Sequence, residues 1–157
     1  MSGNVITFEG SEDAVENVED TINLNGVASQ VSVRHAIVSR AISLRGSEGD
    51  AEIVAPEDLP DCDILVLDCE GTEIEILEKL DFRPRAIIVE THGLYGATES
   101  EVRNKLSRAG YDVVERAIAE KRLQTFCEDN DIYVLYSVLS NNPSRKMPPN
   151  EENHLSS

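Results

Sequence analysis

The chain has 157 residues, which is the size of one compact domain and too short for two ordinary ones. Hydrophobic residues make up 40% and charged residues 28%, as in globular proteins, and the apolar runs are far too short to span a bilayer. Thirty Asp and Glu against 14 Lys and Arg give a net charge of -16, so we expect no nucleic-acid partner.

The first residues lack the basic and then apolar build of a signal peptide, so we expect a cytoplasmic protein. An acidic, lysine-poor surface suits a salt-rich cytoplasm, and we hypothesise a halophilic source. The three cysteines, Cys62, Cys69 and Cys127, lack the spacing of a zinc site or a disulfide framework. We expect them to be small buried side chains.

Short β-prone apolar stretches recur along the chain, and those at 63–67 and 86–89 are continuously apolar. Continuous apolarity is typical of strands that are covered on both faces. The predicted strands are Val5–Phe8, Val31–Val38, Asp63–Leu67, Ala86–Val89, Tyr111–Val114 and Ile132–Val138.

Helical patterns lie between these strands. The first follows Ser11 as N-cap, and the other two begin with capping boxes, formed by Thr72 with Glu75 and by Thr98 with Glu101. No convincing helix joins the last two strands. The alternation predicts a mostly parallel open α/β sheet with an antiparallel hairpin at its C-terminal edge. Residues 1–139 form this domain, and we expect the polar, proline-containing tail 140–157 to be disordered.

In open α/β sheets, ligands bind beyond the carboxyl ends of the strands, where this chain places acidic residues. Glu9 could accept hydrogen bonds from a ribose, or it could be an exposed carboxylate near a helix start. Asp68 and Glu70 could orient a nucleophile, take its proton or lie beside a sulfonium cation; alternatively Asp68 caps a turn and Glu70 is solvated. His92, which follows Glu90, is either a general base or an inert loop residue. We expect His35, in mid-strand, to be structural.

Three stretches around these residues resemble the FkbM family of methyltransferases. VITFEGSEDAVENVEDTINLNG resembles the family's segment in which a strand ends in an acidic residue. DILVLDCEGTEIEILEKL is similar to its most distinctive motif, Asp, any residue, Glu and Gly after an apolar strand. IIVETHG resembles the next strand with its Glu-any-His ending, and the resemblance runs from about Val5 to Val138.

The resemblance implies a Rossmann-like sheet, S-adenosylmethionine (SAM) as cofactor and methyl transfer to an oxygen, often a hydroxyl of a sugar, a lipid or another small metabolite. Glu9 and Gly10 would then bind the SAM ribose, and Ala36 and Ile37 would lie near the adenine. Asp68 would border the methionine part and the reacting methyl group. Glu70 and His92 would face the acceptor, a small molecule or glycan, and with Asp68 they form the expected catalytic set.

The chain departs from the family pattern at its start, where a strand and a glycine-rich loop normally precede the segment matched here. None of its nine glycines forms a GxG, and only residues 1–4 precede the first predicted strand. We therefore expect a domain that is incomplete at its N-terminus and lacks its first, central strand. It is either a fragment with a misplaced start, which we favour, or a decayed or split enzyme, and we expect the isolated chain to be impaired. The neighbouring strands would then expose unpaired edges, close together or recruit another chain, such as a second copy. The rival interpretation is a non-catalytic α/β binding or interaction module that derives from a methyltransferase.

Overall fold

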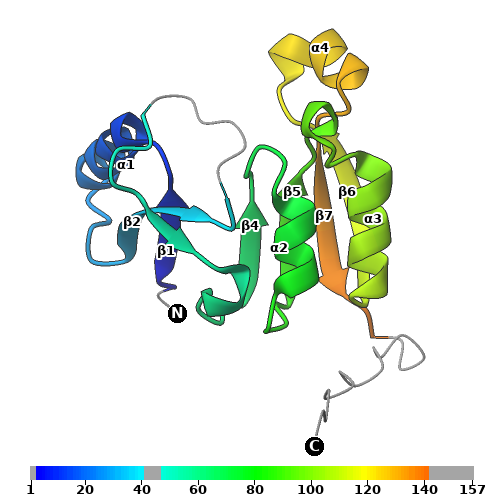
Figure 1. Ribbon diagram of the computed structural model, residues 1–157, viewed down its shortest axis with the longest axis horizontal. Helices are drawn as coiled ribbons and strands as arrows, with labels where there is room; N and C mark the ends of the chain where they lie inside the picture. Colours follow the sequence, from blue (N-terminus) through cyan, green and yellow to red (C-terminus); the bar gives the residue numbers. More distant parts are fainter. Residues whose placement is uncertain (1–2, 41–46, 142–157) are drawn as a thin grey trace, which may run out of the picture.

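The computed structural model describes residues 3–40 and 47–141, in which strands alternate with helices as predicted (Figure 1). The tail expected to be disordered lies almost wholly outside the described residues. Within the described part, no helix is both long enough and apolar enough to cross a membrane.

The N-terminal part forms a parallel sheet of three strands in the order β1 (Val5–Glu9), β2 (Val31–Val38) and β3 (Glu52–Val54). Helix α1 (Glu12–Leu24) connects β1 to β2 and packs against β2. The register pairs Glu9 at the end of β1 with His35. The short strand β3 was not predicted from the sequence.

The second sheet has the order β4 (Ile64–Leu67), β5 (Ala86–Glu90), β7 (Tyr133–Leu139) and β6 (Tyr111–Ile118). Strands β4 and β5 are parallel, and β7 is antiparallel to both β5 and β6, which confirms the predicted hairpin. The later strand, β7, lies inside the sheet and leaves β6 at the edge. A short helix, α4 (Gln124–Asp129), lies between β6 and β7, so the prediction that no helix joins them was wrong.

Helices α2 (Glu73–Lys79) and α3 (Glu99–Arg108) connect the strands of the second sheet, and they bury Ile76 and Leu106 against its core. The same cluster of buried side chains continues into the first sheet through Ala36 and Val54. An ion pair between Arg40 and Glu75 of α2 also joins the two parts. The α/β class is therefore confirmed, with its strands divided between two sheets that share one core.

The edges that face the division are unpaired: among the described strands, β1 pairs with β2 alone and β4 with β5 alone. Apolar side chains on both edge strands are exposed, including Val5 and Ile6 of β1 and Ile64 and Val66 of β4. The sequence left three outcomes open: the two edges could stay unpaired, close together or recruit another chain. In the described structure they stay unpaired.

Of the two predicted capping boxes, only the one at Thr98 forms its N-cap bond, and its Glu101 carboxylate bonds the Thr98 hydroxyl. Thr98 accepts a hydrogen bond from the backbone N of Glu101 (3.3 Å) and donates one to its carboxylate (2.8 Å). Thr72 makes no side-chain cap, and its hydroxyl donates to the backbone O of Cys69 instead. The predicted partner, Glu75, pairs with Arg40 and Lys79, so the capping box at Thr72 was wrong.

Replacing Thr98 with alanine is expected to lower the free energy of unfolding by about 1 kcal/mol, because the N-cap bond and the hydroxyl's bond to the Glu101 carboxylate are both lost. Ser11→Ala is the matched control at another N-cap, since Ser11 makes no side-chain cap. Urea denaturation of both variants measures the difference. Equal losses would contradict the contribution assigned to the Thr98 cap.

Candidate functional site

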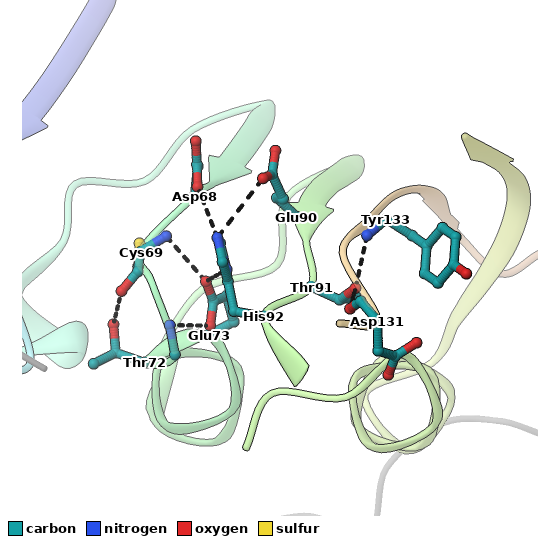
Figure 2. Close-up of polar contacts among 10 residues, drawn as sticks. Asp68, Cys69, Thr72, Glu73, Glu90, Thr91, His92, Asp131 and Tyr133 are labelled. Atoms are coloured by element: carbon teal, nitrogen blue, oxygen red, sulfur yellow. Dashed lines mark hydrogen bonds and ion pairs between the residues drawn. The ribbon is translucent and has the colours of Figure 1, made fainter. Parts of the chain in front are cut away.

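The candidate site lies where the parallel strands β4 and β5 end side by side (Figure 2). Asp68 follows the last residue of β4, Glu90 is the last residue of β5, and His92 comes two residues later. Between β4 and α2 the chain turns sharply, with Glu70 and Gly71 at φ 50° and 111°. This turn carries the chain from the strand end directly into α2 and brings the start of that helix next to His92.

Glu73, the first residue of α2, lies at the centre of the site and is fully buried. Its carboxylate accepts hydrogen bonds from the backbone N of Cys69 (3.0 Å) and of Gly71 (2.9 Å), and it pairs with Nδ1 of His92 at 2.8 Å. It therefore fixes both the turn after β4 and the orientation of the imidazole. Glu73 was not predicted from the sequence, although it lies two positions after the glycine of the distinctive motif.

His92 contacts three carboxylates from three elements, and 9% of its side chain is exposed. Nδ1 faces Glu73, while Nε2 lies 3.4 Å from Asp68 and 3.7 Å from Glu90. Burial lowers the pKa of His92, but the hydrogen bond and charge of Glu73 and the charges of Asp68 and Glu90 outweigh burial and raise it above 6.5. An imidazolium at this position offsets part of the negative charge that the site concentrates.

Asp68, Glu90 and His92 offer ligand atoms that all lie within 4.8 Å of one another, a spacing that a divalent cation could bridge. A metal ion on Nε2 would have to replace the proton there. The carboxylates that raise the pKa of His92 also attract a metal cation, so a proton and a metal ion compete for Nε2.

A cavity of about 140 Å³ opens beside His92. Its lining includes Glu70 and His92, which the resemblance assigned to the acceptor side. Asp68 lies at the other side of Nε2, so the structure brings the three expected catalytic residues to one strand-end region.

The residues expected to bind the cofactor lie mostly in the first sheet. Figure 1 shows that β1 ends on the same side of the molecule as β4 and β5. There an oxygen of Glu9 accepts a hydrogen bond from the backbone N of Ser11 (2.9 Å), and Gly10 is buried between them. Ala36 and Ile37 of β2 are both buried. Glu9 therefore lies at the carboxyl end of its strand, as expected, but it does not belong to the group formed by Asp68, Glu90 and His92.

Two buried polar atoms near Glu9 have no hydrogen-bond partner among the described residues: Oγ of Ser11 and Nε2 of His35. His35, expected to be structural, lies opposite Glu9 in the ladder, and its other ring nitrogen faces Asp50 at 3.6 Å. Buried polar atoms without partners are uncommon and indicate a place where a polar ligand or water can bind. The residues here fit the ribose of a bound nucleoside.

Comparison with known proteins places this arrangement in a class. A protein of Streptococcus pneumoniae, Sp1610, proposed to be a tRNA (m1A22) methyltransferase, matches over 93% of this chain and 56% of its own, with 17% identity and a TM-score of 0.50. That similarity and the strand-end site define a Rossmann-type α/β domain like those of methyltransferases. The chain belongs to the methyltransferase FkbM domain family, which matches residues 4–113 and confirms the resemblance.

A second solved structure, a protein of the NADB-Rossmann superfamily from Streptococcus agalactiae, matches over 88% of this chain and 63% of its own, with 14% identity and a TM-score of 0.49. The comparison with curated proteins gives no significant match. The chain thus spans 56% and 63% of the two solved structures.

Proposed function

We propose that the chain forms the α/β domain of a SAM-dependent methyltransferase that methylates a hydroxyl of a sugar, a lipid or another small metabolite. The observation that carries the proposal is His92, held by the buried Glu73 at the ends of β4 and β5 beside a small cavity. The net charge of -16 disfavours a nucleic-acid acceptor.

His92 is the proposed general base. The imidazolium must first lose its Nε2 proton, which occurs as the pH rises through the raised pKa of His92. In the neutral ring Glu73 accepts the Nδ1 proton, so Nε2 can take the proton of the acceptor hydroxyl. Bound SAM supplies an activated methyl group, so the residues mainly align the acceptor oxygen, exclude water and remove its proton. Asp68, 3.4 Å from Nε2, would border the reacting methyl group, while Glu70, which lines the cavity, would face the acceptor.

Glu9 and Gly10 are the proposed contacts of the SAM ribose, with the unpartnered Ser11 hydroxyl beside them as support. The adenine would lie at the end of β2, next to Ala36 and Ile37. Because these two side chains are buried, the adenine would meet the strand end and not their full side chains. Asp68 would border the methionine part.

Calorimetric titration with SAM tests this function. We expect micromolar binding, and Glu9→Gln should weaken it about tenfold, which corresponds to about 1.4 kcal/mol. Glu16→Gln is the control, because Glu16 is an exposed glutamate on α1. Absence of binding by the folded chain would overturn SAM binding by these residues and would leave the non-catalytic module or a fragment without the glycine-rich loop. An equal effect of the two variants would overturn the assignment of Glu9.

A further inference from the structure

The cavity beside His92 has two walls of different chemistry. One wall is formed by Glu70, Glu90 and His92. The other is apolar, and its residues are Leu94, Tyr95, Phe126 and Ile132. Large apolar side chains are exposed on this second wall, with Leu94 at 59% and Phe126 at 51%. Exposed apolar side chains gathered at the rim of a cavity are typical of a binding surface.

The apolar wall comes from two chain segments that lie next to one another. Leu94 and Tyr95 belong to the short 3-10 helix η2 (Gly93–Tyr95), whereas Phe126 belongs to α4, which projects beyond the strand ends (Figure 1). Gly93 allows the two segments to lie this close. A Cβ at this position would lie 2.6 Å from the backbone O of Asn130 and 2.6 Å from Cβ of Asp131. Any side chain at position 93 would push the two segments apart.

Hydrogen bonds of Thr91 and Asp131 hold this junction (Figure 2). The hydroxyl of Thr91 donates to the backbone O of Asp131 (2.7 Å) and accepts from the backbone N of Tyr133 (3.0 Å). The carboxylate of Asp131 accepts from the backbone N of Glu99 (2.7 Å), at the start of α3. These bonds tie the end of β5 to the start of β7 and to α3, beside the two segments that carry the wall, and so limit how far the segments can separate.

The charge of the cavity restricts what can enter it. Among the described residues that line it, none is Lys or Arg, and two are glutamates. Asp68 and Glu73 do not line the cavity but lie 3.4 Å and 2.8 Å from the two ring nitrogens of His92, and they add negative charge. A phosphate or carboxylate group would be repelled, whereas an uncharged hydroxyl can donate to a carboxylate or to Nε2 of His92.

We propose that this cavity binds an uncharged alcohol that carries an alkyl chain. The hydroxyl lies toward Nε2 of His92, and the chain lies along Leu94 and Phe126. The inference rests on the proposed function and names the class of its acceptor: neutral and amphiphilic, neither a bare sugar nor a phosphorylated compound.

The test compares three ligands by saturation-transfer NMR below their micelle concentrations. Hexyl β-glucoside is expected to bind at least about tenfold more tightly than methyl β-glucoside, because each further buried methylene strengthens binding. Hexyl phosphate carries the same chain on an anionic head and should bind more weakly than hexyl β-glucoside. Equal binding of the two glucosides, or tighter binding of the phosphate, would overturn the proposal.

Two leucine variants test whether hexyl β-glucoside binds in this cavity. Leu94→Ala should weaken binding of hexyl β-glucoside about fivefold through lost apolar contact. Leu24→Ala, which removes an exposed leucine from the end of α1, should leave it unchanged. Equal losses in the two variants would show non-specific adsorption and overturn the site.

A SAM titration of the same sample separates the two proposals. SAM binding without glucoside binding overturns the acceptor class and leaves the methyltransferase function in place. Glucoside binding at Leu94 without SAM binding supports the amphiphile site and overturns the methyltransferase function.

Discussion

Replacing Glu73 with glutamine is expected to lower the free energy of unfolding by about 3 kcal/mol. The carboxylate is fully buried and accepts hydrogen bonds from Cys69 and Gly71 while it pairs with His92. Glutamine has nearly the same shape, but its NH2 group would face one of these donors. Its neutral amide also leaves the imidazolium without its closest counter-charge. Urea denaturation at neutral pH measures the loss.

Glu75→Gln is the matched control, because Glu75 lies on the same helix and forms ion pairs with Arg40 and Lys79 at the surface. Such pairs contribute little to stability, so this variant should unfold close to the wild type. If Glu73→Gln lost no more stability than Glu75→Gln, the central role assigned to Glu73 would be wrong.

Replacing His92 with glutamine is expected to cost about 3 kcal/mol at about pH 5.5 and clearly less at about pH 8.5. The pKa of His92 is raised in the folded chain above 6.5, so the folded state binds this proton more tightly than the unfolded state does. The stabilisation is therefore complete below about 6.5, the unfolded value. It is lost as the pH rises through the higher folded pKa.

Unfolding curves recorded across this range in the presence of a chelator measure the effect without interference from metal ions. Glu90→Gln provides a second measurement: it removes one charge that raises the folded pKa of His92, so the loss of stability should begin at the same pH as in the wild type but be complete at a lower pH. Parallel curves for the wild type and His92→Gln would show that His92 does not titrate as described.

The sequence pattern predicted the rim of the site correctly because continuous apolar runs at 63–67 and 86–89 indicate adjacent parallel strands. The carboxyl ends of adjacent parallel strands lie at the same edge of the sheet. The residues there, Asp68, Glu90 and His92, are therefore brought together. Glu73 could not be predicted in the same way. An acidic residue in the first turn of a helix is ordinarily exposed and favoured by the helix dipole, and its burial here depends on His92, 19 positions later.

Other differences have local causes. The pattern at Thr72 and Glu75 matches a capping box, but after the turn at Gly71 the Thr72 hydroxyl donates to the backbone O of Cys69. Glu75 forms an ion pair with Arg40, which follows β2 of the other sheet. Helix α4 spans six residues, too few for a helical period to be evident. The three cysteines are free as expected, although Cys62 and Cys69 are half-buried and Cys127 alone is buried.

The division between β1 and β4 has a consequence for cooperativity. Hydrogen-bonded ladders transmit strain along a sheet, but the described strands form no ladder across this division. Side-chain packing through Ala36 and Val54 and the Arg40–Glu75 pair connect the two parts instead. The N-terminal part can thus open as a separate unit at a lower free-energy cost than global unfolding. Amide protons on the unpaired edges of β1 and β4 should exchange with solvent before those of β5 and β7.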